Sequence, residues 1–277
     1  SIPGLRVDLT AEQLHDQVRE VGLAVAAATQ DLVPLDKRLY ALRDVTGTVP
    51  SPALIASSVM SKKLAGGAHH VLLDVKCGDG AFMEDRDEAV ALAELCVEIG
   101  RAHGRETGAL VTDMSQPLSA AIGNAIEVGH AVEVLTGDRE GRFRDLCLDL
   151  AASALQLTGV EPDAARTRVE QALASGDAAD RFRRMVAAQG GDVAVVDAGL
   201  GAGRRRKEDD VDPAVGLEVL APVGTTLDAD DVAVRIHARS ADDAAWAAEE
   251  VRACLTLSDG PVEPRPLVLA RVGIEGS

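Results

Sequence analysis

Two pairs of polar side chains interrupt the apolar segment LYALRDVTGTVPSPALIASSVMSKKLAGG, residues 39–67. Ser58 and Lys62 are four residues apart, which places a hydroxyl and an ammonium on one face of a helix. Tyr40 and Arg43 are three apart and share a face if their own segment is helical. The four groups could therefore form a polar pocket for a small ligand. Equally spaced surface residues are common, so a plain solvated face is the alternative.

A helix over residues 51–64 must position the second of these pairs. Ser51 is a suitable N-cap residue, and Pro52 suits the first helical position. Gly66 and Gly67 follow the apolar run and predict its end. The turn DVTGTVP before the helix could bring the first pair toward it.

Short apolar runs alternate with amphipathic segments in the first half of the chain. Three runs resemble buried parallel strands, at 21–30, 69–78 and 107–114. A helical pattern over 84–104 separates the second run from the third. A strand, helix and strand in this order predict an α/β fold with a parallel sheet, whose ligand lies at the carboxyl ends of the strands.

The remaining patterns predict covering helices and a smaller lobe. Residues 116–190 are typical of helices closed by glycines, whereas short strands and a helix after Arg204 lead to a terminal strand at 265–273. The expected architecture is a parallel-sheet lobe, a small all-α lobe and a C-terminal α+β lobe. The expected stretches are the start of the α/β lobe at 1–34, part of the small helical lobe at 35–65, the α/β lobe with its covering helices at 66–197, and the C-terminal lobe at 198–277.

Charge and hydropathy exclude several classes of partner. The 45 acidic against 28 basic side chains give a net charge of −17, which repels nucleic acids and anionic membranes. No apolar run is long enough to span a bilayer, and the first ten residues do not read as a signal peptide. We therefore expect a cytoplasmic protein that acts on a small molecule.

The four cysteines do not follow a metal-binding or disulfide pattern. Cys77, Cys96, Cys147 and Cys254 are scattered, without C-x-x-C spacing. We expect reduced thiols in the core.

Three long blocks, in order, resemble the signature segments of thymidine phosphorylase and pyrimidine-nucleoside phosphorylase. They read LVPLDKRLYALRDVTGTVPSPALIASSVMSKKLAGGAHHVLLDVKCGDGAFM, LVTDMSQPLSAAIGNAIEV and LGAGRRRKEDDVDPAVGL, and the similarity covers almost the whole chain. The resemblance implies that Tyr40, Arg43, Ser58 and Lys62 contact a pyrimidine. It also implies a homodimeric enzyme that needs no cofactor besides phosphate as co-substrate.

The implied reaction is reversible phosphorolysis of a pyrimidine nucleoside to free base and (deoxy)ribose 1-phosphate, a pentosyl transfer. Negative charge develops on the departing base, so Arg43 and Lys62 would act as catalytic residues by stabilising that charge in the transition state. Ser58 can both donate and accept, which suits the edge of the base that carries N3–H beside a carbonyl.

Two segments of the family pattern have no match in the sequence. The family's phosphate-binding motifs would precede Ser1, so we expect the 277 residues alone to show no phosphate-dependent turnover. Several tens of residues are also expected near Asp197 and Ala198, and a wide separation of neighbouring Cα atoms somewhere between Val195 and Gly199 would mark missing residues.

A cation site is the third departure from the family. Some bacterial members bind a monovalent cation through carbonyls that match Leu118 and Ala121, and through a glutamate. Here His130 takes the glutamate's place, which puts this site in doubt.

Other interpretations remain open. A catalytically inactive paralogue could act as a binding or structural protein, and the strand-rich C-terminal segment also resembles biotinyl and lipoyl carrier modules. GLGAGR at 199–204 imitates a dinucleotide-binding loop, but no helix pattern follows it.

The stretch at 74–82 could approach a substrate or form a tight turn with Gly78 and Gly80 at positive φ. Asp113 ends a strand and could support a site from behind.

Overall fold

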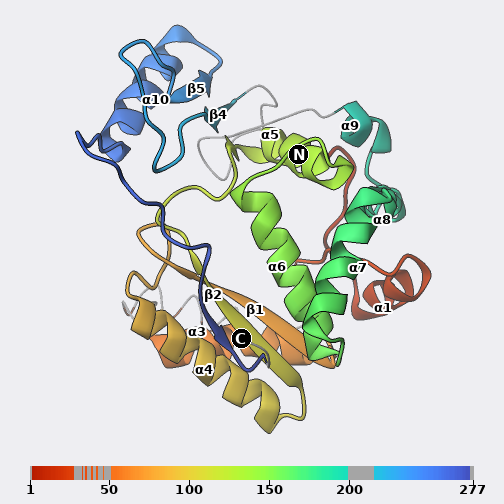
Figure 1. Cartoon of the computed structure of the whole chain (residues 1–277). Coiled ribbons are helices and arrows are strands. Elements are labelled where there is room, and N and C mark those ends of the chain that lie inside the picture. Colours follow the sequence, from red (N-terminus) through yellow and green to blue (C-terminus); the bar gives the residue numbers. More distant parts are fainter. Residues whose placement is uncertain are drawn as a thin grey trace.

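The structure is a computed structural model that describes residues 2–27, 51–198 and 215–274, together with positions 33, 35, 39, 42 and 46. Its centre is a mixed sheet of three strands in the order β1-β2-β6 (Figure 1). β1 (His70–Cys77) and β2 (Glu106–Asp113) run parallel, and α4 (Arg86–Ala102) connects them. The predicted strand, helix and strand unit is therefore confirmed, within two residues at each boundary.

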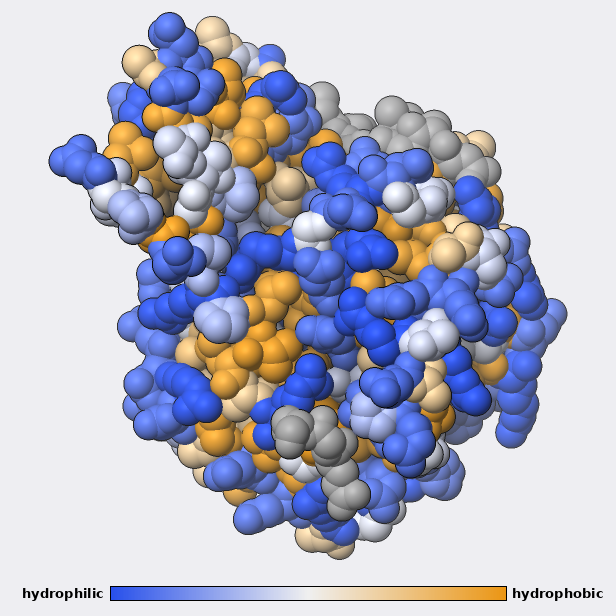
Figure 2. Space-filling model, in the orientation of Figure 1, coloured by the Kyte–Doolittle hydropathy of each residue, from blue (hydrophilic) through white to orange (hydrophobic). Residues whose placement is uncertain are grey.

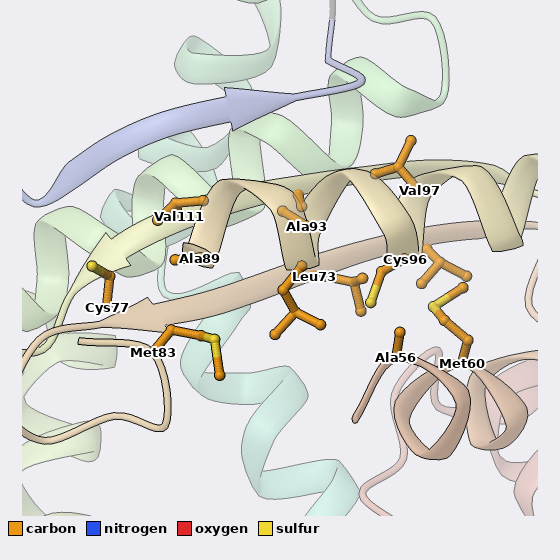
Figure 3. Packing of buried hydrophobic residues seen from close by; sticks show 13 residues of the cluster. Ala56, Met60, Leu73, Cys77, Met83, Ala89, Ala93, Cys96, Val97 and Val111 are labelled. Carbon is orange, nitrogen blue, oxygen red and sulfur yellow. The ribbon is translucent and has the colours of Figure 1, made fainter. Parts of the chain in front are cut away.

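One face of this sheet carries the main hydrophobic core. Side chains from β1 and β2 pack there against α4 and against α3 (Pro52–Ala65). Figure 3 shows Ala56 and Met60 of α3 pointing toward Leu73 and Cys96. Both α3 residues are completely buried, so this core fixes the position of the helix that carries the predicted polar pair.

The other face of the sheet is covered by α6 (Arg142–Leu157), which contacts β1 and β2. Four further helices continue this helical layer: α5 (Asn124–Thr136), α7 (Pro162–Ala174), α8 (Asp177–Ala188) and α9 (Val193–Ala198). The helices predicted for 116–190 are thereby confirmed from Asn124 onward, whereas residues 116–123 are not helical and include a short strand at 121–122.

A second core joins this layer to the start of the chain. Ile2 and Val21, on either side of α1 (Ala11–Glu20), pack with Val186 of α8 and Val196 of α9. Thr10 caps α1 with a reciprocal bond to Gln13, so α1 begins where a local sequence signal places it.

The strand predicted at 21–30 is wrong over residues 21–27, the part that the structure describes. Val21 and Gly22 form a turn after α1, and the following residues join no strand. The amide and carbonyl of Val25 bond to the buried side chain of Gln189, at 3.0 and 2.9 Å. Backbone groups that a sheet would have used are thus satisfied by a residue far away in the sequence.

A small antiparallel sheet forms the second lobe, in the order β3-β4-β5. Its strands are β3 (Ala121–Ile122), β4 (Gly216–Val219) and β5 (Val234–His237), and α10 (Ala241–Cys254) packs on β5. No residue of β4, β5 or α10 is fully buried. Hydrophobic side chains accordingly show on the surface of this lobe (Figure 2).

The terminal strand forms where the sequence predicts it but lies in another place. We expected residues 265–273 in the C-terminal lobe. Instead β6 (Val268–Val272) returns to the central sheet and pairs antiparallel with β2 (Figure 1). It satisfies the edge of β2 that β1 leaves open, which gives the mixed sheet its antiparallel border.

The cysteines divide between core and surface. Cys77 and Cys96 are buried free thiols, whereas Cys147 and Cys254 are free and exposed, so the expectation of core thiols is wrong for this second pair. Burial raises the pKa of the Cys96 thiol to about 11. In the part of the chain that the structure describes, every helix is too short or too polar to cross a membrane.

Candidate functional site

The polar pair on α3 meets as its spacing predicts. The Lys62 ammonium donates to the Ser58 hydroxyl at 2.9 Å and to the Ser58 carbonyl at 2.8 Å. Both residues are partly buried, whereas their neighbours Ser57 and Lys63 are exposed. The helix begins at Pro52 as predicted, although the Ser51 side chain makes no capping hydrogen bond. One face of α3 therefore presents a hydroxyl and a cation together.

A groove of about 550 Å³ lies beside this helix, between α3 and the end of β1. Ile55 and Val59 of α3 line it, and Ser58 and Lys62 lie three positions farther along the same helix. That spacing places the polar pair on the strip of α3 next to the groove. The groove is therefore the space in which the pair could meet a ligand.

The opposite wall of the groove is a tight turn at residues 78–83. Gly78 has a φ of +131°, and a Cβ there would lie 2.7 Å from the amide nitrogen of Ser115. The positive φ predicted for Gly80 is wrong; this glycine is needed because a Cβ would lie 2.9 Å from the Met114 carbonyl oxygen. Phe82 projects from the turn, 70% exposed, and lines the groove. The segment is thus both a tight turn and part of the candidate site.

A polar cluster that the sequence analysis missed borders the groove on β1 and β2. The Lys76 ammonium lies 2.6 Å from an Asp74 carboxylate oxygen and donates to the Thr112 hydroxyl at 3.1 Å. Thr112 in turn donates to Asp74 at 2.5 Å. Alternating polar residues at 74 and 76 in an apolar strand were the available signal. With Asp79, the groove holds two carboxylates and one ammonium, which does not favour an anion.

Asp113 lies behind the groove at the end of β2, and its side chain is completely buried. It accepts a hydrogen bond from Arg142 at 2.7 Å and one from the Ser115 hydroxyl at 2.8 Å. Its carboxylate thus touches the segment that follows β2 and the first residue of α6. The position agrees with a supporting role rather than with direct contact to a ligand in the groove.

The residues considered for a cation do not make a suitable set. His130 is buried, and its Nδ1 is hydrogen-bonded to the Ser119 hydroxyl, which also accepts from the Ala121 amide at 3.1 Å. Burial, reinforced by Arg139, lowers the pKa of His130 and favours a neutral imidazole. Hard monovalent cations prefer oxygen ligands, so the imidazole is a poor replacement for a carboxylate beside the Leu118 and Ala121 carbonyls.

Several predicted residues lie outside the described part of the chain. Tyr40 and Arg43 belong there, as does the loop at 199–204. The break predicted between Val195 and Gly199 is wrong from Val195 to Ala198, because α9 runs continuously through these residues, and only the last possible position of the break, before Gly199, lies outside the described part. Within the described ranges, no group of three or more His, Cys, Asp or Glu side chains could hold a metal ion. The assembled part of the candidate site is therefore the Ser58–Lys62 pair and the groove next to it.

Comparison with protein families gives two matches, in chain order. The model described as glycosyl transferase family, a/b domain, matches residues 1–179. The model described as pyrimidine nucleoside phosphorylase C-terminal domain matches residues 185–258. The two matches together span nearly all of the chain.

Individual relatives agree with this pattern. The chain is 38% identical to thymidine phosphorylase of Burkholderia orbicola (strain MC0-3), over 99% of the chain and 71% of the relative. It is 41% identical to thymidine phosphorylase of Mesorhizobium japonicum, over 91% of the chain and 66% of the relative. It is 41% identical to pyrimidine-nucleoside phosphorylase of Geobacillus stearothermophilus, over 86% of the chain and 63% of the relative.

The length of the first alignment bears on the expected internal break. It covers 311 positions, more than the 277 residues of the chain, so the relative has residues with no counterpart here. The position of that difference near Asp197 stays a prediction.

Proposed function

Because the chain belongs to the thymidine and pyrimidine-nucleoside phosphorylase family, we propose that the protein catalyses the reversible phosphorolysis of pyrimidine nucleosides. The products are a free pyrimidine base and (deoxy)ribose 1-phosphate, which makes the protein a pentosyltransferase. The observation that carries this proposal beyond the family is the Ser58–Lys62 pair, whose helical spacing from Ile55 and Val59 places it on the strip of α3 next to a groove large enough for a nucleoside.

The geometry of α3 suits recognition of a pyrimidine edge. Lys62 Nζ donates to Ser58 Oγ at 2.9 Å, so an ammonium and a hydroxyl lie side by side and could bond to neighbouring polar atoms of one ring. We assign the Ser58 hydroxyl to the ring N3–H or the carbonyl beside it, since a hydroxyl can serve either. Lys62 then lies at a carbonyl oxygen, where negative charge develops as the base departs.

Arg43 and Tyr40 complete the proposed base site. Arg43 would donate to the second carbonyl and share the developing charge with Lys62, which makes these two the catalytic residues of the proposal. Tyr40 would supply apolar area with a polar tip against the base. Their support is the family resemblance of the segment that carries them, together with the assembled half of the site on α3.

Phosphate is the proposed co-substrate, and we assign its site to groups beyond the described walls of the groove. Lys76 is already paired with Asp74, and Asp79 is a further carboxylate, so the described residues that line the groove offer a phosphate dianion no unpaired cation. We propose no other cofactor. A monovalent cation at the Leu118 and Ala121 carbonyls has no role in this proposal, because His130 does not supply the anionic ligand.

We also propose a homodimer located in the cytoplasm. The support for the dimer is the family resemblance. The support for the location is the acidic composition together with the absence of a membrane-spanning helix from the described residues.

The proposed function is tested by following the release of thymine from thymidine and of uracil from uridine by the complete protein. We expect release that requires phosphate and yields one sugar 1-phosphate per base, with a purine nucleoside as the unreactive control. Release without phosphate would indicate a hydrolase. No release of either base, from a folded protein supplied with phosphate, would favour the inactive paralogue.

A further inference from the structure

Both oxygens of the buried Asp113 carboxylate accept hydrogen bonds from other groups of the protein. One oxygen accepts from the Arg142 guanidinium at 2.7 Å. The other accepts from the hydroxyl and the amide of Ser115, at 2.8 and 3.3 Å. Burying an ion pair does not by itself stabilise a fold, because desolvation offsets the attraction. The placement of this pair therefore calls for a reason other than stability.

On one side, the pair is tied to the segment that returns from the C-terminal lobe. Arg142, the first residue of α6, donates its second guanidinium nitrogen to the Arg265 carbonyl at 3.1 Å. The amide of Asp113 donates to the Leu267 carbonyl at 2.9 Å. These two bonds hold the chain just before β6, where it arrives from the small lobe (Figure 1).

On the other side, the pair is tied to the turn that forms a wall of the groove. Met114 follows Asp113; its amide donates to the Cys77 carbonyl at 2.7 Å, and its carbonyl accepts from the Gly80 amide at 3.0 Å. Gly78 lies so close to Ser115 that even a Cβ would clash. With no slack at this contact, a shift of residues 113–115 must move the turn.

We propose that Asp113 and Arg142 are a positioning pair that sets the place of the 78–83 turn, and with it Phe82, at the substrate groove. The pair touches no substrate. It acts through Met114 and Ser115, and its bond to Arg265 makes the C-terminal lobe a second determinant of groove shape. The kinetic part of this inference rests on the proposed function; its structural part does not.

The test uses Asp113→Asn and Arg142→Gln in the complete protein. Asparagine keeps the size of the side chain and one acceptor for Ser115 but removes the charge. We expect amide hydrogen exchange to become about tenfold faster or more at Gly80, whose amide bonds to the Met114 carbonyl, and to become faster at Gly78 and Ala81, whose amides bond within the turn that this contact holds. We also expect the KM for nucleoside to rise about tenfold, with a smaller fall in kcat.

The double variant and a matched control sharpen the test. Because the two residues form one pair, the double variant should be no worse than the worse single variant. Arg166→Gln breaks the ion pair with Asp149, which is more exposed and lies away from the turn, so it should leave exchange at the turn and KM unchanged.

Unchanged exchange at the turn in folded Asp113→Asn and Arg142→Gln variants would overturn the inference, whatever the kinetics. Faster amide exchange at the turn together with an unchanged KM for nucleoside would refute the kinetic part of the inference. If both variants fail to fold, Ser115→Ala is the deciding variant, because it removes only the side-chain bond to Asp113. Amide exchange at the turn that is about threefold faster would support the inference, and unchanged exchange would contradict it. A wild-type protein without turnover would refute the proposed function, while exchange still decides the positioning role.

Discussion

Some contacts between polar side chains near the groove follow from local sequence spacing, and others depend on the tertiary fold. Ser58 and Lys62 interact across one helical turn, so their distance follows from local geometry. Asp74 and Thr112 belong to different strands, and Asp113 and Arg142 are separated by 29 positions. Contacts of the second kind depend on the register of the strands and on where α6 begins, which no local pattern encodes.

His130 provides a pH-dependent prediction at this scale. Burial, then Arg139, lowers its pKa in the folded protein, against a smaller opposing effect of Glu133. The unfolded chain, with an ordinary pKa of about 6.5, therefore binds a proton more readily than the folded protein does. The stability supplied by neutral His130 is complete above that pH and is lost as the pH falls through the lowered pKa. We expect the Tm to fall between about pH 7.5 and pH 5.5.

The measurement for His130 is Tm against pH for the wild type and for His130→Gln. Glutamine keeps a hydrogen-bond acceptor near Ser119 but does not titrate, so the variant should show a shallower decline. The other histidines contribute equally to both proteins, and the difference in slope belongs to position 130. Equal slopes would show that His130 does not couple folding to pH.

Among the elements, those with strong local patterns were predictable from the sequence. α3 and α4 have clear start or stop signals, and β1 and β2 are apolar runs between turn residues. The strand predicted at 21–30 failed over its described part because Gln189 takes the backbone bonds of Val25. The existence of β6 was predictable, but its neighbour was not, since an antiparallel partner for β2 is chosen by the path of the whole chain.

Met60 gives a prediction about how α3 is held. It is completely buried between β1 and α4, whereas Leu54 on the same helix is 41% exposed. We expect Met60→Ala to lower the free energy of unfolding by about 2 to 5 kcal/mol, through lost transfer energy and a cavity. Leu54→Ala, the matched control, should change it by about 0.5 kcal/mol. Urea unfolding of both variants would measure this, and similar values for the two would contradict the packing of α3 described here.

For the whole molecule, charge and architecture support the proposal that the groove beside α3 binds the pyrimidine base and that other groups bind phosphate. A net charge of −17 repels phosphate, and Lys76 at the groove is already paired with Asp74, so affinity for that co-substrate must come from another local set of donors. The described groove instead offers the apolar side chains of Ile55 and Val59 and the exposed Phe82, with the Ser58–Lys62 pair on the neighbouring strip of α3, and this combination suits a flat heterocycle. The central claim is therefore that α3 carries one side of a pyrimidine site.

The most direct test of that claim compares two neighbouring lysines on α3 in the complete protein. Lys62 is partly buried and bonded to Ser58, whereas Lys63 is exposed, and both carry the same charge. We predict that Lys62→Ala lowers kcat/KM for thymidine or uridine phosphorolysis by about 10²- to 10³-fold, because a donor to the departing base is lost. Lys63→Ala should leave kcat/KM nearly unchanged. Equal effects of the two substitutions, whether both small or both large, would contradict the assignment of the base site to this face of α3.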